Sequence, residues 1–145
     1  MKKLTLSDYQ SLAELRYRIR CYLHFSEHAA GAAGLEPRQY QLMLALKGLP
    51  GGVRPRIGEL AERLKIQHHS AVELVNRLAG GGYVRRRRGG TDRREVLLSL
   101  TPKGERVLGE LVLHHTAELR QAGPTLVTAL KRVMRSRQNS GRAGT

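Results

Sequence analysis

The chain has 145 residues, a length that suits one domain or one domain with an appended element. It carries 26 lysines and arginines against 12 acidic residues, and the formal net charge of +14 indicates a polyanionic partner such as nucleic acid. Cys21 is the only cysteine, which excludes an intrachain disulfide, and no apolar run approaches the length of a membrane span. We therefore expect a cytoplasmic protein that makes no membrane contact.

Helical periodicity governs the N-terminal part of the sequence. Apolar residues spaced three and four apart predict a helix over residues 7–30, with Ser7 as its N-cap and two glycines at its end. Pro37 suits the first turn of a second helix, because the missing N–H of proline costs nothing there. This second helix should stop at the Leu-Pro-Gly-Gly cluster of residues 49–52.

Two short helices are predicted next, and their connection is tight. The first spans about residues 57–64, a turn occupies residues 65–68, and the second helix ends at three successive glycines. The start of this second helix is left open, because the Ser70-x-x-Glu73 spacing of a capping box would begin it directly after Ser70. Two such helices have the form of a helix-turn-helix, whose second helix can enter the major groove of DNA.

The period then changes from helical to twofold. Residues 83–86 and 95–100 are predicted to be strands, with alternate residues of the second strand facing inward from Val96 onward. Six of the ten residues 85–94 are arginine and Asp92 is the only acid among them, so the hairpin carries a local charge of +5. A thin, arginine-rich hairpin has the form of a wing and suits the negative potential of a narrow minor groove.

The C-terminal part returns to helical spacing. The Thr-Pro pair at residues 101–102 predicts the start of a fifth helix, and the Gly-Pro pair at residues 123–124 should break it. A last helix is expected over residues 125–135, followed by a disordered tail over residues 136–145. Three apolar stripes exceed the needs of one small core, and we expect them to pack across a twofold axis. These stripes are Leu12, Leu15 and Ile19, then Leu108, Leu111 and Val112, and finally Leu126, Leu130 and Val133.

Six motifs follow one another in chain order. They are Leu-Glu-Pro-Arg-Gln-Tyr at residues 35–40, Ile-Gly-Glu-Leu-Ala-Glu-Arg-Leu at 57–64, Ser-Ala-Val-Glu-Leu-Val-Asn-Arg-Leu at 70–78, Gly-Tyr-Val-Arg at 82–85, Asp-Arg-Arg at 92–94 and Leu-Thr-Pro-Lys-Gly at 100–104. With these motifs the sequence resembles the MarR family of bacterial transcription regulators over nearly the whole chain. The last two motifs together are the most specific part of the resemblance. Glu36 departs from the family pattern, which usually has threonine there.

The resemblance implies a mainly helical fold with a small β-wing, a winged helix-turn-helix that forms homodimers through its N- and C-terminal helices. It places the recognition helix at about residues 67–77, a turn earlier than the capping box does, and the wing tip at residues 88–94. The expected parts are an N-terminal dimerisation helix (1–34), the DNA-binding domain (35–101), C-terminal dimerisation helices (102–135) and the tail (136–145).

These assignments predict the residues that contact DNA. Gln67 and Asn76 carry amides that can pair with adenine, although Asn76 lies late enough in the helix to favour a backbone contact. Asp92 is expected to orient the wing by pairing with Arg77 or with an arginine at the wing base. The full expected set is Gln67, His68, His69, Ser70, Glu73, Asn76, Arg77, Arg86, Arg88, Arg93 and Arg94.

Some helical residues have two interpretations. His24 and His28 on the first helix, with His114 and His115 on the fifth, are of the residue type that binds zinc, but no cysteine or glutamate lies at a recognisable offset. We therefore favour interface histidines and expect no metal. Cys21 is more simply a half-buried helix residue than a redox sensor. Four aromatic residues can line a ligand cleft or fill the core, and we favour the core: Tyr9, Tyr22, Phe25 and Tyr40.

The favoured function is binding of a specific double-stranded DNA sequence by a homodimer, as a repressor at a pseudo-palindromic operator with half-sites about 10 bp apart. The resemblance leaves room for a small-molecule effector that releases the DNA. Two other classes remain: a nucleoid-type architectural protein with weak sequence preference, which the high charge favours, and a protein-interaction module. The sequence contains no Gly-rich phosphate loop, metal-ligand cluster or nucleophile beside a base, so we expect neither an enzyme nor a cofactor.

Overall fold

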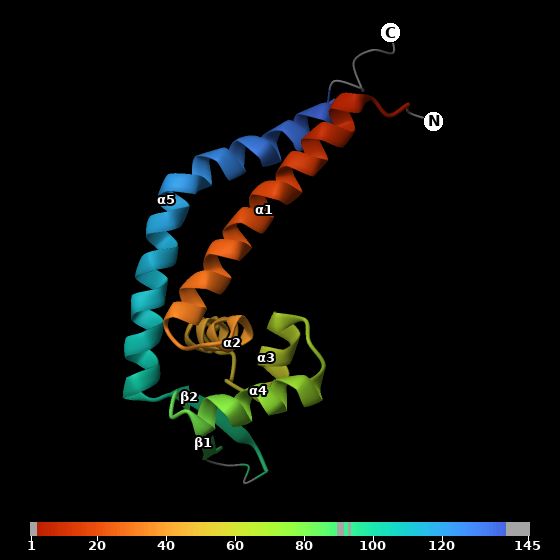
Figure 1. Ribbon diagram of the computed structural model, residues 1–145. Coiled ribbons are helices and arrows are strands. Elements are labelled where there is room, and N and C mark those ends of the chain that lie inside the picture. The colour runs from red at the N-terminus through yellow and green to blue at the C-terminus, as the bar shows by residue number, and fades with distance from the viewer. Residues whose placement is uncertain (1–2, 90–91, 93, 139–145) are drawn as a thin grey trace. The chain divides into compact units, whose positions relative to one another are not determined.

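The structure is a computed structural model that describes residues 3–89, 92 and 94–138. Five helices and a two-stranded antiparallel sheet make up the described chain, as the predicted fold class requires (Figure 1). In chain order the elements are α1 (Leu6–Ala32), α2 (Pro37–Lys47), α3 (Ile57–Leu64), α4 (His68–Gly80), β1 (Val84–Arg88), β2 (Val96–Leu100) and α5 (Pro102–Gln138). The chain divides into two compact units, Ala29–Leu113, called the winged unit below, and Met1–His28 with His114–Thr145, called the helical unit.

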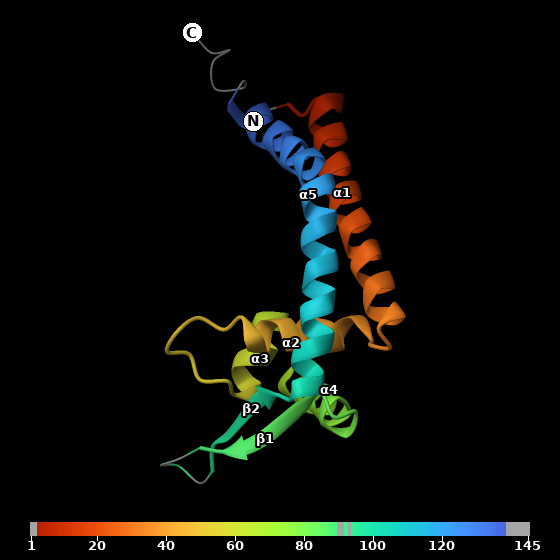
Figure 2. The same cartoon turned by 90° about the vertical axis from the view of Figure 1, so that its left-hand side faces the viewer.

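The winged unit consists of α2, α3, α4, the β-hairpin and the start of α5. The hairpin pairs Val84 with Leu100 at its base and Arg88 with Val96 at its outer end. Figure 2 shows the hairpin and the segment between α2 and α3 projecting in the same direction. Apolar residues at helical spacing on α2, α3 and α4 pack with the base of the sheet into one core. Its largest fully buried side chains are Leu42, Met43, Leu60, Val75, Leu78 and Leu98.

The start of α1 differs from the prediction. Thr5, not Ser7, caps the helix: the N–H of Thr5 donates to the Asp8 carboxylate at 2.8 Å, and the N–H of Asp8 donates to the Thr5 hydroxyl at 3.3 Å. This reciprocal pair is a capping box, which satisfies two amides where a serine cap would satisfy one. At the other end Gly34 adopts a φ of +80°, and the N–H of Leu35 donates to the carbonyl of Ala30 at 2.9 Å, which closes the helix.

The start of α4 follows the family resemblance and not the capping box. The helix begins at His68, with Gln67 as an extended N-cap residue, so Ser70 already lies in the first turn. The chain reverses just before it at Lys65, which ends α3 in the left-handed conformation with a φ of 53°. The backbone geometry of this turn sets the start of α4. The helix therefore begins about one turn before the position that Ser70 would give it as a capping residue.

The predicted inward face of β2 is only partly correct. Leu98 is buried, but Val96 is 36% exposed and Leu97 is 7% exposed, the reverse of the expected alternation at those two positions. Val96 pairs with Arg88 at the outer end of the hairpin and does not belong to the core cluster. Leu97 and Leu98 are both buried, so the alternation breaks between them, where the wing passes beyond the core that its base covers.

The predicted break at Gly123-Pro124 is wrong, because α5 continues through Pro124 to Gln138. Proline removes one helical hydrogen bond and crowds the carbonyl of residue 120, which bends a helix without necessarily ending it. Figure 1 draws α5 as one helix with a bend near its middle. The backbone of residues 136–138, predicted to be disordered, is helical, and residues 139–145 lie outside the described part of the chain.

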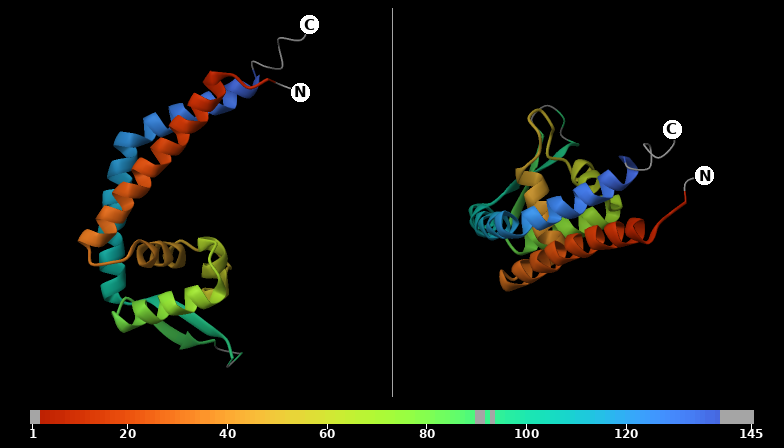
Figure 3. Two further views of the ribbon diagram at one scale, coloured as in Figure 1. Left: turned by 45° about the vertical axis from the view of Figure 1, so that its right-hand side comes forward. Right: turned by 90° about the horizontal axis from the view of Figure 1, so that it is seen from above.

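Part of the predicted dimer stripe on α5 belongs to the core. Leu108 and Leu111 are buried in the winged unit, so these two side chains are not available to a partner subunit, and Val112 is partly buried against the same cluster. One continuous helix belongs to both units: its first turns cover the core of the winged unit, and its remainder pairs with α1 in the helical unit. Figure 3 shows α1 alongside the C-terminal part of α5.

The Leu-Thr-Pro-Lys-Gly motif joins the hairpin to α5. The Thr101 hydroxyl donates to the carbonyl of Gly82 at 2.5 Å and accepts from the N–H of Gly104 at 3.0 Å, while the N–H of Thr101 donates to the carbonyl of Tyr83 at 3.0 Å. The Lys103 ammonium lies 4.5 Å from the Tyr83 ring centroid. A β-carbon on Gly104 would lie 2.1 Å from the Tyr83 carbonyl oxygen, so the motif requires glycine there.

Candidate nucleic-acid interface

Helix α4 presents one polar, exposed face. His69, Glu73 and Asn76 follow one another at spacings of four and three, with Arg77 beside them, and all four are exposed. Gln67 lies exposed at the start of the same helix. The opposite face is buried, through Ala71, Leu74, Val75 and Leu78. The core therefore fixes the rotation of α4 about its own axis and leaves a straight row of hydrogen-bonding side chains in solvent.

The remaining predicted residues of α4 lie at its start. His68 is exposed and Ser70 is half-buried. An exposed helix N-terminus with histidines presents free backbone N–H groups and ring nitrogens, which are donors suited to phosphate oxygens. The residues of α4 that the sequence predicts as DNA contacts thus lie together on one exposed side of the helix, with the half-buried Ser70 at its edge.

The predicted ion pair between Asp92 and Arg77 is not formed. Arg77 pairs instead with Glu36, which precedes α2, at 2.8 Å. Asp92 accepts the backbone N–H of Arg94 at 2.9 Å, and its carbonyl accepts the N–H of Glu95 at 3.1 Å. Asp92 therefore shapes the turn of the wing locally, because a short carboxylate can bond a backbone amide two residues on more easily than it can reach α4.

The wing carries a row of exposed arginines. All four arginines of β1, Arg85 to Arg88, are exposed. Arg86 donates to the side-chain carbonyl oxygen of Asn76 on α4, which places Arg86 and, by strand alternation, Arg88 on the side of the hairpin that faces this helix. Arg94 is also exposed, and Arg93 lies outside the described residues. The hydrogen bond from Arg86 to Asn76 thus joins the polar face of α4 to the basic wing.

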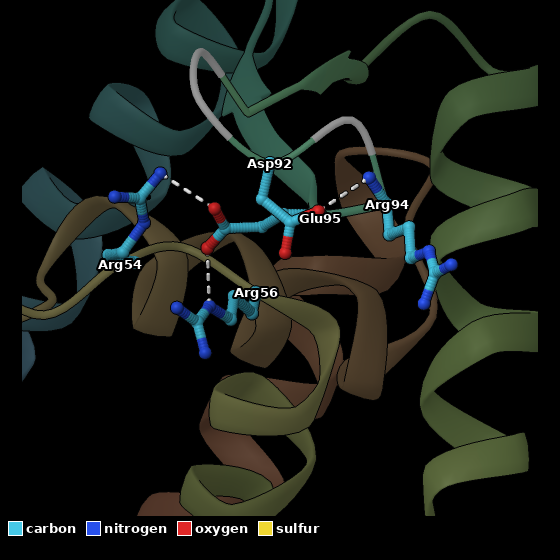
Figure 4. A network of polar contacts seen from close by, with 5 residues as sticks. All are labelled: Arg54, Arg56, Asp92, Arg94 and Glu95. Carbon is cyan, nitrogen blue, oxygen red and sulfur yellow. Dashed lines mark hydrogen bonds and ion pairs between the residues drawn. The ribbon is translucent and has the colours of Figure 1, made fainter.

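Glu95 is a residue of this surface that the sequence did not predict. Each oxygen of its carboxylate forms an ion pair with one arginine, with Arg54 at 2.8 Å and with Arg56 at 2.5 Å. Figure 4 shows both arginines on this carboxylate. The N–H of Leu98 on β2 donates to the carbonyl of Pro55 at 2.9 Å. A sequence signal did exist, because two arginines flanking a proline in an extended segment project to the same side. The partner 39 residues away was not identifiable from local spacing.

An open hollow of about 700 Å³ lies between the wing and the start of α3. Its charged lining comprises two arginines and four carboxylates, with His68 beside them: Arg56, Arg94, Glu59, Glu62, Asp92 and Glu95. The carboxylates outnumber the arginines, so the hollow is not a basic cleft. The basic groups at its rim are those of the wing and of the segment before α3.

The other candidate residues have structural surroundings. The rings of His24 and His28 lie 4.7 Å apart, but the described residues contain no group of three metal-ligating side chains. His115 is buried, with its Nε2 atom 2.8 Å from the Ser26 hydroxyl. Cys21 is exposed, not half-buried as expected, and it borders a small hollow that residues of α5 also line. These groups form no chemical site among the described residues.

The four aromatic residues do not share one environment. Tyr40 belongs to the core of the winged unit, as favoured from the sequence, and Tyr9 is exposed. Tyr22 and Phe25 pack edge-on against the His115 ring, at centroid distances of 6.1 and 5.5 Å. Burial raises the pKa of Tyr22 above its ordinary value.

In the described part of the chain no helix is long and apolar enough to cross a membrane.

Comparisons with known proteins agree with this architecture. A model of the MarR family matches residues 33–95. The fold is similar to AbsC, a MarR family transcriptional regulator from Streptomyces coelicolor, with a TM-score of 0.74 and 22% identity over 99% of both chains. It is also similar to RV1404 from Mycobacterium tuberculosis, with a TM-score of 0.69 and 21% identity over 98% of both chains.

A third similar structure covers less of the chain. ZitR, a zinc-responsive MarR family member from Lactococcus lactis, has a TM-score of 0.53 and 26% identity, over 62% of this chain and 60% of its own. A comparison with curated proteins gave no match. The family model over residues 33–95 and the fold of the chain together confirm the resemblance: this protein has the winged helix fold of MarR family transcriptional regulators.

Proposed function

We propose that the protein is a transcriptional regulator, not an enzyme, that binds a specific sequence of double-stranded DNA. Helix α4 lies in the major groove and the arginines of the wing lie in the adjacent minor groove. The observation that carries the proposal is the contact between Arg86 and Asn76, which joins the exposed polar row of α4 to the basic wing. The contacting set comprises Gln67, His68, His69, Ser70, Glu73, Asn76, Arg77, Arg86, Arg88, Arg93 and Arg94.

The family fold supports the remaining parts of the proposal. In the proposed division of labour, residues 35–101 bind DNA, and the dimer forms through residues 1–34 and 102–135, apart from the first turns of α5, which belong to the core of the winged unit. The protein acts in the cytoplasm as a repressor at a pseudo-palindromic operator, and a small-molecule effector releases it from the DNA. Repression and release rest on the family fold alone.

The experiment that tests the proposal is selection of bound sequences from random duplex DNA. We expect a pseudo-palindromic motif with half-sites about 10 bp apart. Its affinity should exceed that for random DNA by about 10³-fold or more. A ratio near one would instead favour a nucleoid-type architectural protein, the second candidate, which the net charge of +14 favours.

Exposed apolar side chains in the helical unit support a homodimer. On α1, Leu12 is 53% exposed and Ile19 is 41% exposed, and on α5 Leu130 is 46% exposed. Two helices packed only on each other leave such side chains in water, and an apolar patch of this kind typically marks an interface between proteins. We therefore expect sedimentation at low micromolar concentration to show twice the chain mass of 16.2 kDa.

A matched pair of substitutions makes this prediction specific. Leu130→Glu should shift the protein toward monomers, because it places a charge in the apolar patch. Leu44→Glu, at a similarly exposed leucine on α2 of the winged unit, should leave the dimer intact. A parent protein that sediments as a folded monomer would contradict the proposed dimer.

A further inference from the structure

We propose that Glu95 is a positioning residue that makes the segment of residues 53–56 a second basic edge of the DNA interface. The ligand of this edge is the phosphodiester backbone that flanks the bases contacted by α4. The inference rests on the proposed function and extends it, because the wing and α4 alone do not include this segment. Two arginines, Arg54 and Arg56, make the contacts in this proposal.

The geometry around the Glu95 carboxylate carries the inference. Its side chain is 11% exposed, whereas those of Arg54 and Arg56 are 47% and 57% exposed. Each carboxylate oxygen holds one guanidinium group, at 2.8 Å for the Nη2 atom of Arg54 and at 2.5 Å for the Nε atom of Arg56. A guanidinium group has five N–H donors in a planar fork, so both arginines keep donors that face solvent.

Backbone contacts hold the same segment against the wing. The carbonyl of Pro55 accepts the N–H of Leu98 at 2.9 Å, and the carbonyl of Glu95 accepts the N–H of Gly89 at 2.8 Å. A β-carbon on Gly89 would come within 2.7 Å of a Glu95 carboxylate oxygen, so the carboxylate lies directly against the turn of the wing. One backbone hydrogen bond and two ion pairs therefore join the segment to the hairpin.

The chemistry favours phosphate as the ligand. The two guanidinium groups and the Glu95 carboxylate together carry a net charge of +1, on a part of the winged unit that projects in the same direction as the wing (Figure 2). The carboxylates of Glu59, Glu62 and Asp92 line the adjoining hollow, so the phosphate contact is assigned to the solvent-facing donors of the two arginines and not to the hollow. Arginine binds phosphate oxygens in a bidentate manner when its planar group is oriented in advance. Glu95 supplies that orientation and lowers the entropy that two long side chains would otherwise lose on binding.

The decisive variant is Glu95→Gln. The loss of a negative charge predicts tighter binding to DNA, whereas the loss of arginine positioning predicts weaker binding. Removing the carboxylate raises the charge of each subunit by one, which by simple electrostatics should tighten binding to DNA. If Glu95 positions the arginines, affinity for the selected operator should instead fall by about tenfold or more. The control is Glu105→Gln, which makes the same charge change at the exposed Lys47–Glu105 pair and should not weaken binding.

A second variant tests the arginines themselves. The double substitution Arg54→Ala with Arg56→Ala should make the slope of log affinity against log salt shallower by about two to four per dimer. Hydroxyl-radical footprinting should show that the double variant loses protection of the flanking sugars and keeps the centre of each half-site. Thermal melts of all variants, measured beside the binding titrations, report whether the winged unit remains folded.

The outcomes distinguish this inference from the proposed function. Binding by a folded Glu95→Gln variant that is as tight as that of Glu105→Gln overturns the positioning role. An unchanged footprint and slope for the double arginine variant overturns the second edge. In both cases the parent protein would still select its operator, whereas failure of the proposed function would appear as a parent protein with no preferred sequence.

Discussion

Raising the salt concentration from 50 to 200 mM is expected to weaken operator binding by about four orders of magnitude. Each phosphate that an arginine or lysine neutralises releases condensed counterions, which contributes about −0.9 to the slope of log affinity against log salt. With about four phosphate contacts per subunit, a dimer makes about eight, and the expected slope is near −7. A fluorescence anisotropy titration at several salt concentrations measures this slope.

Two substitutions separate the electrostatic part of binding from the sequence-specific part. Arg94→Ala, in the exposed wing, should reduce the magnitude of the slope by about two per dimer. Gln67→Ala, at the start of α4, should change sequence preference and leave the slope nearly unchanged, because base contacts release few ions. Lys131→Ala, an exposed change on α5, serves as a control. A parent slope near −2 would mean that the basic charge is mostly solvated surface.

Replacing Gly104 by alanine is expected to destabilise the winged unit by about 3 kcal/mol or more. The new β-carbon would lie 2.1 Å from the carbonyl oxygen of Tyr83, an atom of the backbone that cannot rotate away. That oxygen also accepts the N–H of Thr101 at 3.0 Å, so relieving the clash disrupts the junction of β1 with α5. Chemical denaturation followed by circular dichroism gives the free energy of unfolding.

The control for this prediction lies one turn further along the same helix. A β-carbon on Gly109 meets no atom within 4 Å, and the residue is exposed. Gly109→Ala should therefore raise the free energy of unfolding slightly, by up to about 1 kcal/mol, through helix propensity alone. Equal effects of the two substitutions would show that the junction at Tyr83 tolerates a side chain.

Much of the winged unit was predictable because its signals are local. The bounds of α3 and the proline at the start of α2 follow from spacing and from chain stiffness, and the structure confirms both. The start of α1 was missed because two capping residues compete there, and Thr5 has a reciprocal partner in Asp8 that Ser7 lacks. Pro124 was wrongly predicted to end a helix. One lost hydrogen bond is a small fraction of those in a long helix, so α5 continues through it.

The polar contacts of the candidate interface were less predictable, because they join residues far apart in the chain. Arg77 pairs with Glu36, 41 residues away, and Arg56 pairs with Glu95, 39 residues away. Charge density alone identified the wing as basic. Which carboxylate meets which arginine depends on packing that periodicity does not encode, so the role of Glu95 emerged only from the structure.

The hydrogen bond between Arg86 and Asn76 has a consequence for how operator preference can change in evolution. Under the proposed function, Asn76 belongs to the helix in the major groove and Arg86 to the wing in the minor groove, and each side chain constrains the rotamer of the other. Substitutions in α4 and β1 will then be epistatic: a change that suits a new base at one groove disturbs the fit at the neighbouring groove. New operators would be acquired through paired changes at these two positions more readily than through single steps.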